Sequence, residues 1–159
     1  MDPADRGSGG GPVLLVSTQG GHLAQLLALR GWYAAHDRVW VCPDTADVRD
    51  KLADERVVTS YSPTTRHVPN LLRNLGLALR VVRAERPALV LSTGAGVAVP
   101  FFVVAWLMRI PTVFIEVYDR VDSATMTGRL VAPFTTRRIA QWDSQLDVYP
   151  DARLVGPLL

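Results

Sequence analysis

Short apolar stretches alternate along this chain with longer segments in which apolar residues recur at helical spacing. The short stretches are rich in β-branched and aromatic residues, which favour strands. Strands are predicted at residues 13–16, 38–42, 57–60, 88–92, 112–115 and 138–141, with a final extended piece at 152–155. Helices are predicted at residues 23–35, in a short segment ending at 54, and at 69–85, 97–109, 123–131 and 143–149. Strands that alternate with helices predict an α/β fold, a single Rossmann-like domain whose six-stranded parallel sheet carries helices on both faces.

Composition narrows the class of protein without deciding its function. The chain has 159 residues, 48% of them hydrophobic, which is enough for one domain with its own core. The basic residues include one lysine, Lys51, and form no basic run with interleaved aromatics, so nothing favours nucleic acid as a partner. The single cysteine, Cys42, excludes an internal disulfide and fits a reducing cytoplasm. Residues 1–11 are polar and glycine-rich with no signal-peptide core, and predict a disordered tail before a domain at 12–159.

Three loops that follow predicted strands form the candidate site. Gly20, Gly21 and His22 follow the first strand, residues 93–96 follow the fourth, and residues 116–120 follow the fifth. In the usual Rossmann order the first and fourth strands are neighbours and the fifth lies beside the fourth. We therefore expect the loops to converge on one cleft, where glycines let the backbone approach a phosphate and helix amides point at it. Taken singly, a glycine pair after a strand is usually a tight turn.

The loop after the fifth strand has several functional side chains close together in the sequence. Glu116, Tyr118, Asp119 and Arg120 stand directly after the strand, and either of residues 122 and 123 (Asp and Ser) can cap the following helix. A carboxylate and an arginine beside a helix start suit a phosphorylated or sugar-bearing substrate. The alternative interpretation is a strand followed by a capped turn and a surface ion pair.

His22 is the candidate general base. It stands at a helix start, where the positive end of the helix disfavours a charged ring, and a neutral imidazole is what a general base requires. The alternative is a histidine that caps or packs. His36 is expected to be a helix C-terminal cation and His67 a loop residue. No set of histidine, cysteine and carboxylate residues has metal-ligand spacing, so we predict no metal.

A competing motif opens the helix after the fourth strand. Gly94 and Gly96, with Glu116 twenty residues beyond, resemble a dinucleotide-binding fingerprint. Val99 stands at the third glycine position, where close packing needs a small residue. NAD binding is therefore the less favoured interpretation.

Two apolar segments raise the question of membrane contact. Residues 88–108 contain no charge, but Gly94, Gly96 and Pro100 interrupt them, and a strand, loop and helix explain them without a membrane span. On helix 69–85 a helical wheel gives one apolar face, an arginine edge, and a side expected to be wet. The apolar face consists of Leu71, Leu72, Leu75, Leu79 and Val82. The arginine edge consists of Arg73, Arg80 and Arg83, and the side expected to be wet carries Leu77 and Val81. The helix either faces the core with a solvated arginine stripe or docks on anionic lipid.

Three segments resemble a known family. They are residues 17–29 (STQGGHLAQLLAL), residues 92–101 (STGAGVAVPF), and a long motif formed by 115–130 (IEVYDRVDSATMTGRL) and 139–158 (IAQWDSQLDVYPDARLVGPL). The resemblance runs over residues 13–159, to the oligosaccharide-biosynthesis family of asparagine-linked glycosylation protein fourteen, whose bacterial exopolysaccharide members are the PssD-type proteins. It implies the acceptor-binding half of a GT-B glycosyltransferase, similar to the N-terminal half of MurG, with the donor-binding half on a separate protein.

The resemblance also implies a reaction. The pair would transfer a sugar from a UDP-sugar, expected to be UDP-N-acetylglucosamine, to a polyprenyl-diphosphate-linked acceptor in polysaccharide or oligosaccharide biosynthesis. This subunit would sit peripherally on the cytoplasmic face of the plasma membrane and need no cofactor of its own. A non-catalytic nucleotide- or phosphate-binding module that uses the same cleft is the alternative.

Site residues are carried over from the family's motifs. His22 is the implied base, with Glu116 as an alternative base or a ligand of the acceptor hydroxyl. The implied acceptor and diphosphate contacts are Gly20, Gly21, Thr93, Gly94, Ala95, Gly96, Arg120, Thr127, Gly128 and Arg129. The sequence departs from the family pattern at Asp119 and at residues 122–126. Asp119 would repel a diphosphate, so we expect it to pair with an arginine or to face away.

The C-terminal residues are expected to touch the second subunit. A one-chain relative would cross into its second domain at Gly156, Pro157, Leu158 and Leu159, and two uncovered leucines predict an interface. The alternative is a frayed end. We therefore expect a heterodimer that is active only when both subunits are present.

Overall fold

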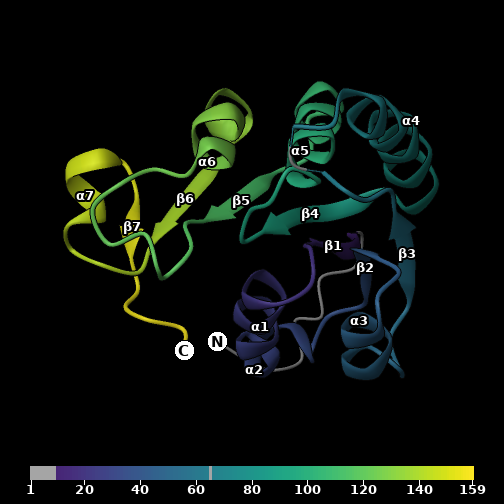
Figure 1. Ribbon diagram of the computed structural model, residues 1–159, viewed down its shortest axis with the longest axis horizontal. Helices are drawn as coiled ribbons and strands as arrows, with labels where there is room; N and C mark the ends of the chain where they lie inside the picture. The colour runs from purple at the N-terminus through teal and green to yellow at the C-terminus, as the bar shows by residue number, and fades with distance from the viewer. Residues whose placement is uncertain (1–9, 65) are drawn as a thin grey trace.

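The apolar stretches pair side by side into one parallel sheet. A computed structural model describes residues 10–64 and 66–159, and Figure 1 displays the sheet with its covering helices. The strands are β1 (Gly11–Val16), β2 (Arg38–Pro43), β3 (Val57–Ser60), β4 (Pro87–Ser92), β5 (Thr112–Ile115), β6 (Arg137–Ala140) and β7 (Arg153–Leu154). Their order is β3-β2-β1-β4-β5-β6-β7, so the predicted neighbours of the first and fourth strands are confirmed. Leu14 of β1 stands between Val39 of β2 and Val90 of β4.

The predicted strand count of six is wrong, because the sheet has seven strands. The extended piece expected at 152–155 pairs with β6, where Arg153 lies opposite Ile139 and Leu154 opposite Ala140. At the other end, Gly11 already opens β1, two residues before the predicted start. Residues 1–9 of the expected tail lie outside the described residues.

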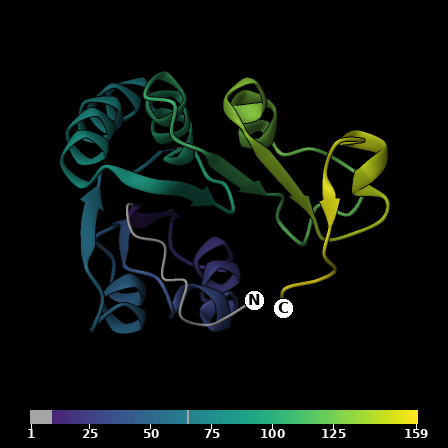
Figure 2. The same ribbon diagram turned by 180° about the vertical axis from the view of Figure 1, so that it is seen from behind.

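Helices cover both faces of the sheet, as Figure 1 and the reverse view in Figure 2 display. The helices are α1 (Gly21–Ala28), α2 (Arg30–Tyr33), α3 (Ala46–Lys51), α4 (Val68–Glu85), α5 (Ala98–Leu107), α6 (Met126–Val131) and α7 (Gln145–Val148), with a short 3-10 turn at Ala132–Phe134. The α4–α6 face is packed with Leu14, Val39, Leu77, Phe101 and Phe114 among others, and the α1–α3 face with Leu15, Leu26, Trp40 and Ile115 among others. Alternate residues of a buried strand point to opposite faces, which is why β1 feeds both cores.

Two predicted helices differ most from the structure. The helix expected at 23–35 is divided at Leu29 into α1 and α2, and the helix expected from residue 123 begins at Met126. Its N-cap is Thr125, whose hydroxyl accepts a hydrogen bond from the Gly128 amide at 3.0 Å, so neither predicted cap residue is used.

The orientation predicted for the helix at 69–85 is also wrong. Leu77 and Val81, assigned to the wet side, are buried in the core, whereas Leu72 is 62% exposed. The reason lies in two buried asparagines, Asn70 and Asn74, which take the inward stripe near the start of α4. Asn70 donates to the Pro63 carbonyl at 2.9 Å, and Asn74 bonds both the amide and the carbonyl of Tyr61 at 2.9 Å. These bonds hold the β3–α4 loop. Of the predicted apolar face, Leu71, Leu72 and Leu79 are exposed, whereas Leu75 packs against the core and Val82 is buried in it.

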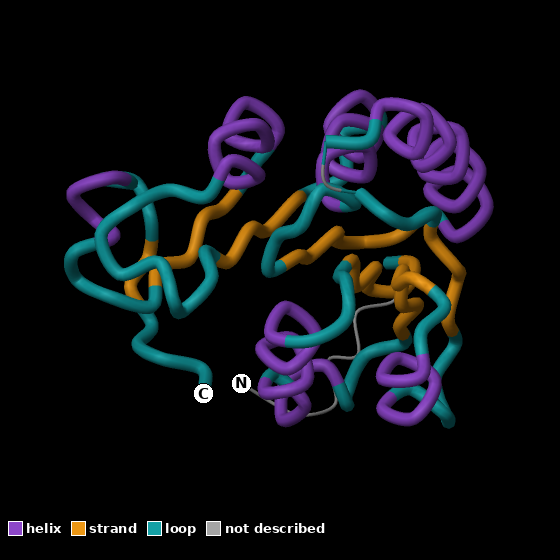
Figure 3. Tube along the Cα trace, in the orientation of Figure 1, coloured by secondary structure: helices purple, strands orange, loops and turns teal. Residues whose placement is uncertain are grey.

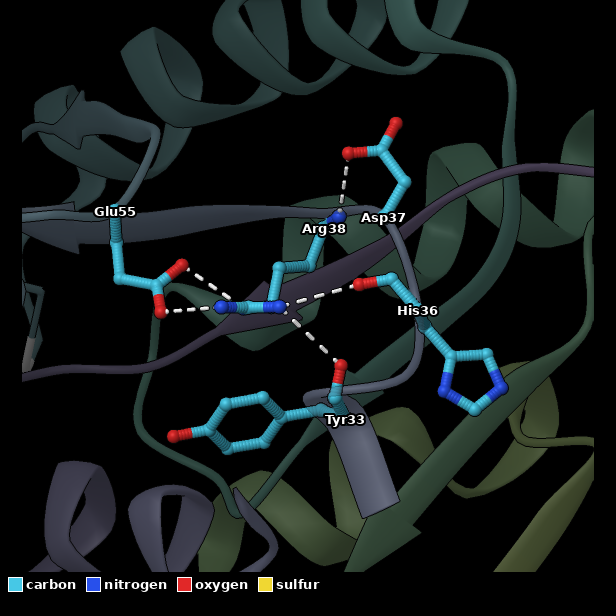
Figure 4. A network of polar contacts seen from close by, with 5 residues as sticks. All are labelled: Tyr33, His36, Asp37, Arg38 and Glu55. Carbon is cyan, nitrogen blue, oxygen red and sulfur yellow. Dashed lines mark hydrogen bonds and ion pairs between the residues drawn. The ribbon is translucent and has the colours of Figure 1, made fainter. Parts of the chain in front are cut away.

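An arginine with several hydrogen-bond partners, Arg38, lies at the amino end of the sheet. Figure 4 displays Arg38 at the start of β2, where its guanidinium donates to both carboxylate oxygens of Glu55 at 2.9 and 2.7 Å. It also donates to the carbonyls of Tyr33 and His36 at 3.4 and 3.2 Å. The pKa of Arg38 is raised, chiefly by its hydrogen bond to Glu55. A bidentate pair of this kind fixes the start of β2 to the segment before β3.

Because the strands are parallel, the loops after β1, β4 and β5 all leave the carboxyl end of the sheet. Figure 3 displays the loops in teal between the strands and the helices. Within residues 10–64 and 66–159, no helix combines the length and the apolar character that crossing a bilayer requires.

Candidate functional site

A cleft of about 720 Å³ lies at the carboxyl edge of the sheet, between the starts of α1, α4, α5 and α6. The polar side chains and backbone that line it are Thr18, Gln19, His22, Ser62, Thr64, Arg66, His67, Gly96, Thr125 and Thr127. Its apolar lining is Pro63, Val68, Leu71, Ala95, Val99, Met126 and Leu130. Two of the three expected loops thus meet here with the start of α6, and the β3–α4 loop joins them as a wall that sequence reasoning missed.

The ring of His22 is fixed by its neighbour Thr93. Nδ1 of His22 lies 3.1 Å from the Thr93 carbonyl oxygen, and the Thr93 hydroxyl donates to the His22 carbonyl at 2.8 Å. A carbonyl oxygen can only accept, so Nδ1 carries the proton and Nε2 of the neutral ring is bare. The half-buried ring therefore brings to the cleft a nitrogen that can accept a proton.

The glycines of the second motif allow the walls of the cleft to pack closely. A Cβ on Gly94, whose φ is +117°, would lie 3.2 Å from Cε1 of His22. A Cβ on Gly96 would lie 2.7 Å from the carbonyl oxygen of Thr64. One glycine thus makes room for the candidate base and the other for the β3–α4 loop, while Gly96 and Ala95 themselves line the cleft.

The first glycine pair, Gly20 and Gly21, lies outside the lining of the cleft. The Gly20 amide donates to Asp47 at 3.1 Å, and the carboxylate of Asp47 also pairs with Lys51 at 2.7 Å. These partners, Lys51 first and then the Gly20 amide, lower the pKa of Asp47. The Gly20 amide thus has a carboxylate partner, and neither Gly20 nor Gly21 lines the cleft, so their contact with a diphosphate stays a prediction.

Glu116 lies behind the cleft in a buried cluster with Thr125, Gly128 and Tyr149, which we call the Glu116 cluster. Its side chain is fully buried and does not line the cleft. One carboxylate oxygen accepts from the Tyr149 hydroxyl at 2.6 Å and from the Thr125 amide at 3.3 Å. The other oxygen accepts from the Val117 amide at 3.2 Å. Burial, and then the hydrogen bond to Glu116, raise the pKa of Tyr149.

Gly128 completes the packing of this cluster. A Cβ at this position would lie 2.5 Å from the Tyr149 hydroxyl and 2.6 Å from the Glu116 carboxylate. The cluster therefore holds the first turn of α6, and through it Thr125 and Thr127, at the edge of the cleft.

The remaining predicted contacts lie apart. Arg120 and Arg129 are exposed and do not line the cleft, and Thr93 reaches it only through His22. Asp119 is exposed and takes part in no ion pair among the described residues, which agrees with the expectation that it faces away.

The lining of the cleft contains one arginine and two histidines. Among the described residues, Arg66, His22 and His67 line it, no carboxylate does, and one part of it is apolar. Within residues 10–64 and 66–159, no cluster of histidine, cysteine and acidic side chains has the arrangement of a metal site. Such a cleft suits a ligand that has an anionic group and an apolar tail.

Comparison with known families identifies the chain's relatives. The family model described as "Oligosaccharide biosynthesis protein Alg14 like" matches residues 51–158. The chain belongs to this family. Within the family it is similar to the UDP-N-acetylglucosamine transferase subunit ALG14 of Homo sapiens, with 25% identity over 92% of this chain and 82% of the human protein. The corresponding subunit of Candida albicans is 26% identical over 58% of this chain and 45% of that protein.

Solved structures share the fold of this Alg14-like chain. MurG of Acinetobacter baumannii superposes with a TM-score of 0.70 and 18% identity, over 83% of this chain and 42% of MurG. The UDP-GlcNAc 2-epimerase of Neisseria meningitidis bound to UDP-GlcNAc gives a TM-score of 0.70 at 13% identity, over 92% of this chain and 47% of the epimerase. The chain thus spans less than half of these two enzymes, and the similarity concerns the fold.

Proposed function

We propose that this chain is the acceptor-binding, membrane-associated subunit of a two-component glycosyltransferase. The pair uses a UDP-sugar, UDP-N-acetylglucosamine in the first instance, and a sugar linked to a polyprenyl diphosphate. The observation that carries the proposal is the cleft. Its described lining has an arginine, two histidines and an apolar side, and contains no carboxylate. Membership of the Alg14-like family and the fold shared with part of MurG support the same activity.

His22 is the general base of the proposed reaction. Its bare Nε2 takes the proton of the acceptor hydroxyl while the hydroxyl oxygen bonds to C1 of the donor sugar. The bond between C1 and the phosphate oxygen breaks, UDP leaves with the bonding electrons, and the configuration at C1 inverts. Glu116 positions α6 instead, because its carboxylate is buried and both of its oxygens accept hydrogen bonds from the protein.

The donor-binding half belongs to a second subunit. The relatives of this chain are named as subunits of a UDP-N-acetylglucosamine transferase, which supports a separate donor-binding partner. The C-terminal segment Gly156–Leu159 forms part of the contact. The Leu158 amide donates to Gln141 at 2.9 Å, which directs the segment along the sheet, while Val155 and Leu159 are 51% and 59% exposed. Exposed apolar side chains next to an edge strand provide a surface for a partner.

The outward face of α4–α6 is the proposed membrane surface. Its exposed apolar side chains are Val68, Leu71, Leu72 and Leu79 on α4, Trp106, Leu107 and Met108 at the end of α5, and Met126 and Leu130 on α6. Arg73, Arg80 and Arg83 belong to the same α4 surface and form no ion pair with any described residue. Val68, Leu71, Met126 and Leu130 also line the cleft, so a lipid tail can pass from the cleft to this face. The subunit thus binds peripherally to the cytoplasmic face of the plasma membrane.

A transfer assay tests the proposal. The chain is co-purified with its donor-binding subunit and incubated with a panel of UDP-sugars and prenyl-diphosphate-linked sugars. We expect transfer by the pair and none by either chain alone, and deletion of residues 156–159 should reduce both co-purification and transfer. Transfer by the single chain would contradict the two-component enzyme. Binding of the lipid diphosphate without transfer by the pair would favour the non-catalytic binding module.

A vesicle assay tests the membrane surface separately. Reversing the charge of Arg73, Arg80 and Arg83 together should reduce sedimentation with anionic vesicles, and the loss should be greatest at low salt. The matched control reverses Arg30 and Arg49, which lie on the α1–α3 side. Equal binding by the wild-type chain and the α4 variant would mean that the arginines are only solvated.

A further inference from the structure

Two histidines of the cleft carry their protons on different ring nitrogens. In His22, Nδ1 donates to the Thr93 carbonyl, so Nε2 is bare. In His67, Nδ1 accepts from the backbone amide of Asn70 at 3.1 Å. An amide N–H can only donate, so Nδ1 of His67 carries no proton and the neutral ring holds its proton on Nε2. One histidine thus offers the cleft an acceptor nitrogen and the other an N–H donor.

The His67 ring is held in place by its role as the N-cap of α4. Besides the bond to its ring, its carbonyl accepts from the Leu71 amide at 3.0 Å. Asn70 in turn donates to the Pro63 carbonyl at 2.9 Å, which fixes the loop beneath the ring. The ring is half-buried and lines the cleft, and no hydrogen bond among the described residues uses Nε2. The proton on Nε2 is therefore a positioned donor that is available to a ligand.

The surroundings decide which chemical group this donor meets. Arg66 precedes His67 and lines the same cleft, and no carboxylate of the described residues lines it. The apolar side chains of Val68 and Leu71 follow on α4. A group that accepts from an N–H beside an arginine and continues into an apolar tail is a phosphate attached to a lipid. Phosphate oxygens accept strongly from such donors.

We propose that His67 binds a phosphate oxygen of the lipid-linked acceptor through its Nε2 proton, while His22 receives the proton of the acceptor hydroxyl. This assignment rests on the proposed function and specifies which residue holds the diphosphate. The two histidines cannot exchange these roles, because the Thr93 carbonyl and the Asn70 amide fix opposite tautomers.

Asparagine and aspartate at position 67 provide the test. The two residues are about equally good N-caps, and each preserves an acceptor for the Asn70 amide. His67→Asn removes the ring donor, and His67→Asp also adds a negative charge to the cleft. The matched controls are Thr45→Asn and Thr45→Asp, because Thr45 caps α3 through Val48 in the same way but does not line the cleft. Binding of farnesyl diphosphate is measured by calorimetry, with farnesol as the probe that lacks the phosphates.

We expect His67→Asn to weaken farnesyl diphosphate binding by about 10- to 100-fold, the worth of one hydrogen bond to a charged group, and His67→Asp to weaken it further. Farnesol binding by the His67 variants, and farnesyl diphosphate binding by the Thr45 controls, should change by less than about twofold. Such a change is well below the contribution of one hydrogen bond to a charged group. In the pair, His67→Asn should raise the acceptor KM and leave kcat nearly unchanged, since ground-state and transition-state binding are lost together. Equal farnesyl diphosphate binding by the wild type and both His67 variants would overturn the proposal.

Nitrogen NMR of the wild-type chain tests the tautomers without any substitution. The expected result is a proton on Nδ1 of His22 and on Nε2 of His67, with the His67 resonance shifting when farnesyl diphosphate is added. A proton on Nδ1 of His67 would overturn the assignment whatever the variants do. If this binding pattern holds and the wild-type pair still transfers no sugar, the proposed transferase activity fails while the lipid-diphosphate contact stands.

Discussion

The cleft and the Glu116 cluster lie next to each other, and they differ in whether their polar groups are available to a ligand. In the cleft, His22 and His67 each use one ring nitrogen to hold their position and have the other available. In the Glu116 cluster, both carboxylate oxygens accept hydrogen bonds, and the Tyr149 hydroxyl donates one of them. The first region is built to receive a ligand, and the second is built to hold an element of structure.

The contrast teaches that residue type alone does not identify a catalytic group. A glutamate after a buried strand and a histidine after another look equally suited to act as a base. Glu116 has no access to the cleft, whereas His22 lines it with a nitrogen whose protonation state is set by Thr93. Changes in the cleft should therefore affect turnover more than stability, and changes in the Glu116 cluster should do the reverse.

The largest effect is expected from His22→Ala. Loss of the base should lower turnover by the pair by roughly 10²–10⁴-fold, with little change in thermal stability. His36→Ala is the matched control, because Nδ1 of His36 likewise donates to a backbone carbonyl, that of Trp32 at 3.0 Å, outside the cleft. Near-normal turnover by a folded His22→Ala pair would remove His22 from the role of base.

Tyr149→Phe should lower the stability of the fold more than the turnover. It leaves the buried Glu116 carboxylate without its closest partner, which should cost about 1.5–3 kcal/mol of unfolding free energy. The control is Tyr61→Phe, since Tyr61 is exposed and its hydroxyl bonds to no described residue. Denaturant unfolding measures both, and an unchanged midpoint for Tyr149→Phe would mean that the cluster does not stabilise the fold.

Gly128→Ala sharpens the same contrast. The added Cβ would overlap the Tyr149 hydroxyl and the Glu116 carboxylate, so we expect a loss of about 1–2 kcal/mol. Gly76→Ala in α4 is the matched control, because a Cβ there meets nothing within 4 Å. It should stabilise the chain by about 0.5–1 kcal/mol through helix propensity. A stabilising Gly128→Ala would show that α6 is free to shift.

The smallest effect is expected at Asp47, which holds the first glycine loop from outside the cleft. Because its pKa is lowered, its carboxylate stabilises the fold above the ordinary value of 3.8, and this contribution disappears as the pH falls through the lowered pKa. Asp47→Asn should thus lower the Tm slightly at neutral pH, and the difference should close in acid. Asp50→Asn on the same helix is the control. A difference that grows in acid would contradict the pairing with Lys51 and Gly20.

The order of the sheet and its helices could be predicted because each strand is a short apolar run bounded by turn residues. Convergence of the loops after β1 and β4 also followed from the order of the strands. The six-strand count was wrong because β7 has two residues, Arg153 and Leu154, and no apolar periodicity distinguishes so short a strand from a loop. The divided helix at Leu29 likewise carries no local signal in the sequence.

The composition of the site was harder to predict, because it depends on contacts that are distant in the sequence. The burial of Glu116 is set by Tyr149, thirty-three residues away, and the occupied amide of Gly20 by Asp47, twenty-seven residues away. His67 was predicted to be a loop residue because no glycine motif accompanies it. The available signal was the pair of asparagines on the apolar side of α4, since a buried amide needs a partner and the preceding loop is within reach.

That pair of asparagines also bears on how the protein can change over evolutionary time. Asn70 and Asn74 form hydrogen bonds with the backbone of the β3–α4 loop, at Pro63 and Tyr61. These bonds do not involve the side chains of Ser62, Thr64 and Arg66. A loop anchored in this way can exchange its side chains without losing its path, much as a hypervariable loop does on a constant framework. The cleft can therefore gain new ligand preferences by substitution at a few loop positions while the scaffold beneath them is inherited unchanged.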